Sequence, residues 1–154
     1  MSNELELEYF QEQLKLAKQM VVVLRYSFER AEPIIQLINE NAEINAEHAE
    51  ILEALTARFA RLNDTLTQKL FRAIDALELT DEGSLIDRFN RMEKRGIVIS
   101  ANELIEMRKL RNQIAHEYVI EDLMPLYGNV FVQCEILFNV MDSILTYASD
   151  NGWD

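Results

Sequence analysis

The scarcity of glycine and proline is the feature that most restricts how this chain can fold. Its 154 residues include 4 glycines and 2 prolines, so tight turns and chain breaks must be few. Apolar residues make up 49% of the chain, which is enough to bury a core. We therefore expect a single domain over residues 1–154, built from long elements.

Apolar residues recur at spacings of three and four along most of the chain, which is typical of helices that face a core. The first stripe predicts a helix over residues 4–32, which Pro33 should end or kink. Residues 34–45 are polar and should form a helical turn and a loop. A second long helix is expected from 46 to 77, where another apolar stripe ends.

Two serines mark the starts of further helices. Ser84 with Asp87 has the spacing of an N-terminal cap, and it predicts a short helix that ends before Gly96. Ser100 with Glu103 has the same capping-box spacing and predicts a helix over residues 100–118.

The last helix is expected to carry a wide apolar face. Pro125 and Gly128 should interrupt the chain before or early in this helix. Such a helix is either central in a bundle or shared with a partner chain. The predicted fold is all-α, an antiparallel bundle of four main helices with one short helix packed on it. Two neighbouring apolar stripes form the wide face: Val130, Cys134, Leu137, Met141, Ile144 and Ala148, with Phe131, Phe138 and Leu145 beside them.

The charge is strongly acidic but unevenly spread. The net charge is −12, which argues against broad binding of nucleic acid, and no DNA partner is expected. Residues 88–111 nevertheless hold seven of the 15 basic residues and only three acids, so this segment is +4. A local anion site is therefore compatible with an acidic chain, and so is a basic partner.

The sequence gives no sign of export or of a membrane. The single cysteine, Cys134, excludes an internal disulfide framework. The acidic start of the chain is unlike a secretory signal. The apolar run 20–24 is far shorter than the ~20 residues that span a bilayer. We expect a cytoplasmic protein without membrane contact.

Few residues could carry chemistry, because the sequence has no glycine-rich phosphate loop and no Cys/His set with metal-ligand spacing. Of the two histidines, His48 has the surroundings of a solvated surface residue. His116 lies one helical turn after Asn112, whose amide could orient the imidazole. Arg111 and His116 would project about 140° apart on one helix. From spacing alone, Arg111 could equally pair with a surface acid, and His116 could cap the helix C-terminus.

The segment Arg108–Tyr118, RKLRNQIAHEY, resembles the signature of the HEPN superfamily: Arg, a polar residue, three further residues and His. Arg111, Asn112 and His116 fill that pattern, and the added Tyr118 is similar to the HepT branch. The preceding residues 88–100 resemble the short helix, glycine and connector found there, and residues 58–70 resemble the second helix of the family. The likeness covers roughly residues 50–145.

This resemblance implies a homodimer that cuts RNA as a toxin, without a metal ion or a cofactor. His116 would be the acid–base residue, Arg111 would hold the scissile phosphate, and Asn112 would orient the imidazole or contact the phosphate. Arg108 and Lys109 are candidates for further RNA contacts.

The resemblance also implies a partner, a small nucleotidyltransferase of the MntA type. As the antitoxin, it would attach AMP to Tyr118 and so bring negative charge to the cleft. Two alternatives stay open. One is a non-catalytic nucleotide- or substrate-binding subunit of a nucleotidyltransferase, and the other is a helical scaffold unrelated to nucleotides.

Overall fold

The computed structural model describes residues 2–116 and 120–154, and every regular element in them is a helix. The all-α prediction is therefore confirmed. In chain order the helices are α1 (Ser2–Asn39), α2 (Ala46–Thr65), the π-helical segment η1 (Leu66–Leu70), α3 (Phe71–Leu77), α4 (Leu85–Lys94), α5 (Ala101–His116) and α6 (Ile120–Asp150).

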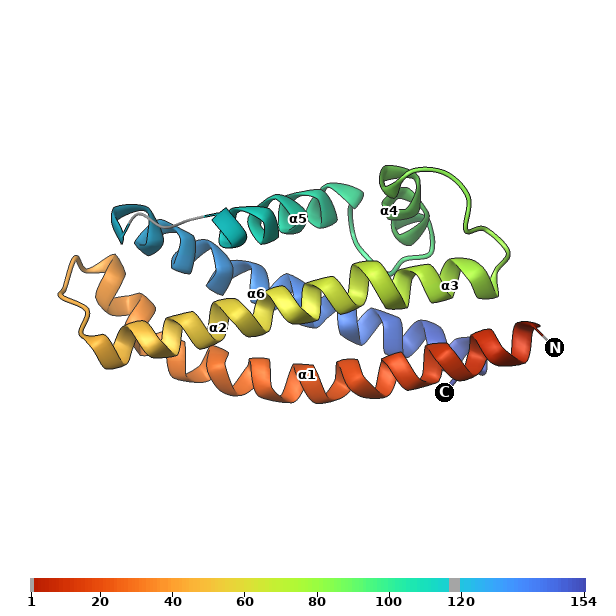
Figure 1. Cartoon of the computed structure of the whole chain (residues 1–154), viewed down its shortest axis with the longest axis horizontal. Coiled ribbons are helices and arrows are strands. Elements are labelled where there is room, and N and C mark those ends of the chain that lie inside the picture. Colours follow the sequence, from red (N-terminus) through yellow and green to blue (C-terminus); the bar gives the residue numbers. More distant parts are fainter. Residues whose placement is uncertain (1, 117–119) are drawn as a thin grey trace.

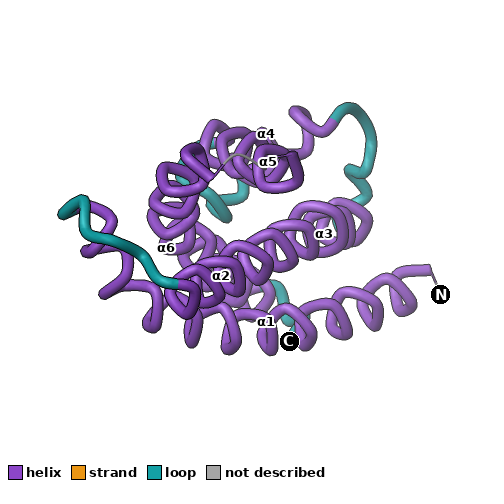
Figure 2. Tube along the Cα trace, turned by 60° about the vertical axis from the view of Figure 1, so that its left-hand side comes forward, coloured by secondary structure: helices purple, strands orange, loops and turns teal. Residues whose placement is uncertain are grey.

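The long helices lie side by side (Figure 1). α1 and the continuous rod formed by α2, η1 and α3 run in opposite directions, and α6 lies behind them. α5 packs on α2 and α6, on the other side of the rod from α1, and the two chain ends lie at the same end of the molecule. Figure 2 shows α4 beside α5, with α1 at the opposite side of the molecule. α1 and α5 therefore present separate surfaces.

α1 is longer than the predicted helix, because Pro33 lies inside it and does not end it. Proline removes one backbone donor and costs a helix interior about 3 kcal/mol. The next two residues, Ile34 and Ile35, are 4% and 7% exposed, so continuing the helix buries two large side chains. This burial offsets the proline, and the helix runs on to Asn39 before a short loop.

The second rod spans residues 46–77 as predicted, but it contains the π-helical turn Leu66–Leu70. The reason lies in the spacing of its apolar residues. Leu62, Leu66, Leu70 and Ile74 follow one another at intervals of four, and all are at most 1% exposed. Three such steps on an ideal α-helix would rotate the last residue about 120° from the first. The wider π turn absorbs this drift and keeps all four in the core.

The start of α4 follows the prediction, whereas the start of α5 differs. The Ser84 side chain accepts from the Asp87 N–H at 3.2 Å, and the Ser84 N–H donates to the Asp87 carboxylate at 2.8 Å. At α5, the Ser100 hydroxyl accepts from the Asn102 N–H. The expected return bond from Glu103 is not among the hydrogen bonds of the described residues. Instead, the Glu93 carboxylate of α4 accepts from the Ala101 N–H at 2.7 Å and joins the two helices.

The last helix begins earlier than expected. Pro125 and Gly128 lie within α6 and do not break it, since Leu126 and Tyr127 directly after the proline are each 3% exposed. The predicted stripe of α6 is buried throughout: Val130, Cys134, Leu137, Met141, Ile144 and Ala148.

The second row of apolar residues on α6 packs on α1. The Phe28 ring stacks on Phe131 with centroids 4.4 Å apart and meets the edge of Phe138 at 5.6 Å. The wide apolar face of α6 therefore packs against other helices of the same chain. Among the described helices, α6 over Leu123–Asp150 is the one long and apolar enough to cross a membrane, and a core helix of a soluble bundle has the same composition.

Candidate functional site

The residues of the HEPN-like segment divide between two faces of α5. Ala101, Leu104, Met107 and Leu110 recur every three residues and form its buried face. Asn112 and His116 are exposed on the other side, one turn apart. Arg108 lies one turn before Asn112 and is exposed as well. We call Arg108, Asn112 and His116 the α5 column.

Arg111 points away from this column, toward α2. Its guanidinium donates two hydrogen bonds to the carboxylate of Asp64, from Nε to Oδ1 at 3.0 Å and from Nη2 to Oδ2 at 3.0 Å. The two side chains are 31% and 33% exposed. Such a two-pronged contact fixes the plane of the guanidinium as well as its position. Asp64 therefore positions the guanidinium of Arg111. The remaining nitrogen of that guanidinium, Nη1, forms no hydrogen bond to the described residues.

The ion pair also affects the pKa of Arg111 and the net charge around it. The hydrogen bond to Asp64 is the main reason that the pKa of Arg111 is raised above its ordinary value. Arg111 is thus a permanent cation, but a carboxylate at contact distance offsets its charge. An anion that binds here would therefore meet a guanidinium in a fixed orientation, but little net positive charge.

His116 and Arg111 do not meet within one chain. The imidazole lies on the exposed face at the end of α5, and the guanidinium lies against α2. No side-chain hydrogen bond joins Asn112 to His116 in the part of the chain that the structure describes. Tyr118, the residue matched to the AMP acceptor, lies outside the described residues. A single chain therefore presents two separated halves of the predicted site.

Most of the remaining basic segment is engaged in an internal ion network around Asp75. This carboxylate is completely buried and accepts from three guanidiniums: Arg88 at 2.9 Å, Arg91 at 2.8 Å and Arg95 at 2.7 Å. Arg95 also reaches Glu78, which accepts from the Tyr147 hydroxyl of α6. The network ties α4 to α3 and α6.

The pKa of Asp75 reports how the network is balanced. Burial by itself raises the pKa of this carboxyl, but the hydrogen bonds from Arg91, Arg95 and Arg88 outweigh it and hold the pKa below the ordinary value of 3.8. The hydrogen bond that Arg91 donates to Asp75 in turn raises the pKa of Arg91. Asp75 therefore stays ionised in the interior and acts as the anchor of α4.

These pairings reduce the positive charge that residues 88–111 can offer to a ligand. Of its seven cations, five are paired with carboxylates, including Lys109 with Glu106 at 3.3 Å. Lys94 and Arg108 are the two without an ion pair to the described residues. Of Arg108 and Lys109, the two residues expected to make further RNA contacts, Arg108 is thus the exposed cation whose charge is not offset by a carboxylate of the described residues. The described residues also contain no group of three or more His, Cys, Asp or Glu that could hold a metal ion.

Comparisons with protein-family models, curated proteins and solved structures return no match. The likeness to the HEPN superfamily therefore rests on the sequence segment itself.

Asp64 is the residue that sequence reasoning missed. It is 47 residues from Arg111 in the chain, so no local spacing connects them. The sequence around Asp64 offers no sign of the pair, because its neighbours Asn63 and Thr65 are polar residues whose burial appears only in the folded chain.

Proposed function

We propose that this chain is a HepT-like RNA endonuclease of the HEPN superfamily, the toxin of a toxin–antitoxin pair, acting in the cytoplasm as a homodimer without a metal ion. The observation that carries the proposal is the arrangement of α5. Arg111 is held rigidly by Asp64, whereas His116 is exposed at the end of the same helix. A phosphate-holding cation needs the first property and an acid–base residue needs the second.

The chemistry follows from these two side chains. The imidazole of His116 would take the proton of a ribose 2′-hydroxyl, and the oxygen would attack the adjacent phosphorus. The bond from phosphorus to the 5′-oxygen would break, and an imidazolium would return a proton to that leaving oxygen. Nη1 of Arg111, which forms no hydrogen bond to the described residues, would donate to a phosphate oxygen as negative charge builds in the transition state. Because Asp64 already fixes the guanidinium, little reorganisation would be needed.

The separation of the two groups supports a site built from two chains. Arg111 and His116 of one helix project about 140° apart, so one substrate phosphate cannot easily touch both. A second copy related by a two-fold axis would bring its own α5 column to the same phosphate. Arg108 of the column, which forms no ion pair with the described residues, would then steer RNA toward this site.

Control of such a toxin is proposed to come from a small nucleotidyltransferase antitoxin. AMP attached to Tyr118, two residues after His116, would place a phosphodiester close to the column. Its negative charge would compete with RNA for Arg108 and Arg111.

A second candidate function is a non-catalytic subunit that binds nucleotide beside a nucleotidyltransferase. The observation in its favour is the pairing of five of the seven cations in the basic segment. A single nucleotide needs fewer free cations than an RNA chain does.

The decisive experiment is induction of the chain in a bacterial host, with total RNA examined on a gel. We expect growth arrest and new RNA fragments with the wild type, and neither with His116→Ala or Arg111→Ala. Gln113→Ala is the matched control, since Gln113 is exposed on the same helix and should leave cleavage intact. Each variant must be shown to be soluble and folded at the growth temperature, because Arg111→Ala loses its ion pair with Asp64 and is expected to melt at a lower temperature.

Two outcomes would redirect the proposal. Fragments that persist in His116→Ala would refute the assigned acid–base residue. Intact RNA and normal growth with soluble wild type would favour the nucleotide-binding subunit. Mass spectrometry after co-expression with a nucleotidyltransferase would then show whether AMP is added to Tyr118.

A further inference from the structure

The basic residues of this acidic chain are concentrated in two segments that the fold brings together. One is residues 88–111, and the other is residues 54–74 of the second rod, which contain four basic residues and the single acid Asp64. Together the two segments hold 11 of the 15 basic residues of the chain and only 4 of its 27 acids. The ion pair between Asp64 and Arg111 joins them. Positive charge is therefore gathered where α5 packs on the rod.

Three of the four cations of the rod are available to a ligand. Arg61, Lys69 and Arg72 are exposed, and none of their side chains forms a hydrogen bond or an ion pair to the described residues. The fourth cation, Arg58, points toward α1, where its guanidinium donates to the Val23 carbonyl at 3.1 Å. The rod thus carries exposed positive charge that no ion pair within the described residues neutralises.

The π turn keeps Arg72 in line with Asp64. Asp64, Gln68 and Arg72 follow one another at intervals of four, each two residues after a member of the buried line over Leu62–Ile74. Because the wider turn holds that buried line on one face, it holds this second line on one face as well. Gln68 and Arg72 are exposed, and Asp64 contacts α5. The second line therefore runs along the solvent edge of the rod, on the side of α5.

α5 adds two arginines to the same edge. Arg108 lies three residues before Arg111 and projects about 60° from it, and Arg61 has the same relation to Asp64. Both Arg108 and Arg61 are exposed, so each lies on the solvent side of the ion pair. α5 runs opposite to the rod (Figure 1), which puts Arg108 on the Arg72 side of the pair. We call these four arginines, which cover roughly 16 Å of helix, the cationic strip; in order along the rod they are Arg61, Arg111, Arg108 and Arg72.

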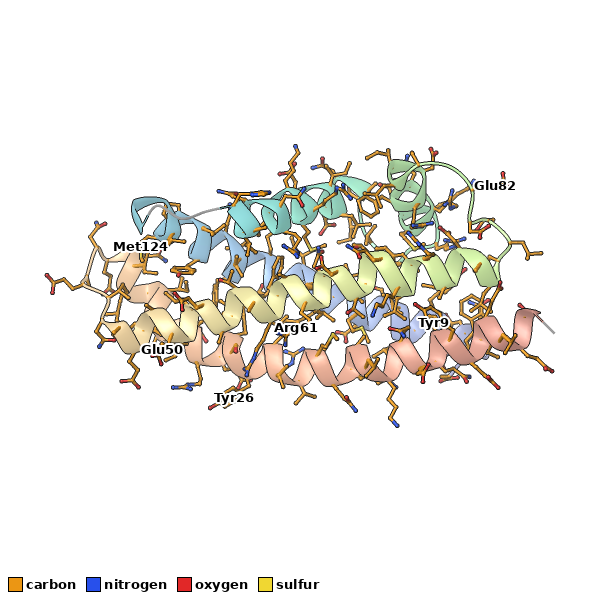
Figure 3. The ribbon with its side chains drawn as sticks, viewed as in Figure 1. Tyr9, Tyr26, Glu50, Arg61, Glu82 and Met124 are labelled. Carbon is orange, nitrogen blue, oxygen red and sulfur yellow. The ribbon has the colours of Figure 1, made fainter. Side chains whose placement is uncertain are left out.

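Acidic residues lie beyond both ends of the strip. Figure 3 shows Arg61 near the middle of the rod, with Glu50 toward the start of α2 and Glu82 beyond the end of α3. Both acids within α5 project at least about 140° away from Arg108 on an ideal helix. The strip is therefore a bounded positive surface on a chain that is otherwise strongly acidic.

We propose that the cationic strip is the track along which a single strand of RNA reaches the candidate site on α5. The inference rests on the proposed ribonuclease function and deepens it. Arg61 and Arg72 would donate to phosphates on either side of the one that Arg111 holds, and Arg108 would donate to a phosphate between them. A line of separate cations over this length suits consecutive phosphates of one strand better than a lone anion.

The strip should hold the RNA backbone without reading its sequence. The two aromatic residues of the segment 54–74, Phe59 and Phe71, are completely buried, and α5 contains no phenylalanine, tyrosine or tryptophan. The strip therefore offers no such ring for a base to stack on, and contacts to phosphate carry no sequence information. With three arginines free of ion pairs, the logarithm of the association constant should fall by about 2 for each tenfold rise in salt.

RNA binding by the whole chain tests the strip directly. The protein carries His116→Ala to prevent cutting, the probe is a fluorescein-labelled oligouridylate of about twelve nucleotides, and fluorescence anisotropy is measured at several salt concentrations. Arg72→Glu should weaken binding by about tenfold at low salt and lower the salt slope by about 0.7. Arg61→Glu, at the other end of the strip, should have the same effect. Lys18→Glu is the matched control, because Lys18 is exposed on α1, across the rod from α5, and it should change the affinity by less than about twofold.

The strip and the ribonuclease proposal can fail separately, because cleavage by the wild type is measured in its own assay. RNA that the wild type cuts, but that Arg72→Glu binds as tightly as its parent does, would refute the strip alone. An equal loss of affinity in Lys18→Glu would refute it too. RNA that is bound through the strip and never cut would refute the ribonuclease alone. A folded protein that binds a polyglutamate peptide but not the oligouridylate would assign the strip to an acidic protein partner and overturn the proposal.

Discussion

The pair between Asp64 and Arg111 can be measured as a coupling free energy. Truncating one partner leaves the other charge without its partner, and truncating both removes the interaction, so a double-mutant cycle isolates the pairwise contribution. The variants are Asp64→Ala, Arg111→Ala and the double variant, and the measured quantity is the free energy of unfolding in urea.

The expected magnitude follows from the geometry. Fully exposed ion pairs contribute about 0.2–1 kcal/mol, whereas charge-assisted, two-pronged contacts are stronger. Both side chains are about one-third exposed, and both prongs are 3.0 Å long. We therefore expect a coupling of about 1–1.5 kcal/mol, discounted for solvent screening. Each kcal/mol corresponds to a shift of about 2–4 °C in melting temperature for a chain of this size.

The same helix supplies the control. Glu106 and Lys109 form a single contact of 3.3 Å with side chains 47% and 70% exposed. Their cycle should give no more than about 0.5 kcal/mol. If the Asp64–Arg111 coupling is as small as this control, Arg111 is not held in solution, and the reasoning about its rigidity fails.

Three further predictions concern the interior. Asp75→Asn should lower the free energy of unfolding in urea by about 3–5 kcal/mol, because three arginines lose their common carboxylate. Asp81→Asn is the control, and this change at an exposed residue should cost less than about 0.5 kcal/mol. A loss as small as this at Asp75 would mean that the network contributes little to stability. Because the folded pKa of Asp75 is below 3.8, its stabilisation is complete above that value and is lost as pH falls through the lower folded pKa. Acid unfolding of the wild type should therefore be steeper with pH than that of Asp75→Asn. Burial raises the pKa of Cys134 to about 12, so its thiol should react with a thiol reagent only as fast as the chain unfolds, and rapid labelling of the folded protein would show that the α6 face opens.

The helices were predictable to the extent that apolar spacing decides them. The stripe of α6 and the span 46–77 follow directly from spacings of three and four. The two prolines were misleading because their cost is local, whereas the benefit of burying Ile34, Ile35, Leu126 and Tyr127 depends on the neighbouring helices. The sequence did contain a sign of the π turn, namely three successive intervals of four between Leu62 and Ile74.

The site was predictable only in part. Arg111 and His116 were correctly expected to project on different faces, because helix geometry fixes that angle. The partner of Arg111 was not predictable, since Asp64 lies in another helix, 47 residues away in sequence. The same holds for Asp75, the common partner of Arg88, Arg91 and Arg95. A count of +4 over residues 88–111 cannot reveal that most of those charges are already engaged. Pairing of this kind is a property of the folded chain.

The π turn at Leu66–Leu70 gives the second rod an unusual tolerance to changes in length. In an ordinary helix, loss of one residue would turn every later side chain by about 100° and expose the core. Here the turn already holds one residue more than an α-helix needs. A deletion within it would close the turn to ordinary α geometry and leave Phe71 and Ile74 facing inward. Relatives that lack one residue at this point could therefore keep the same core and the same position of Asp75.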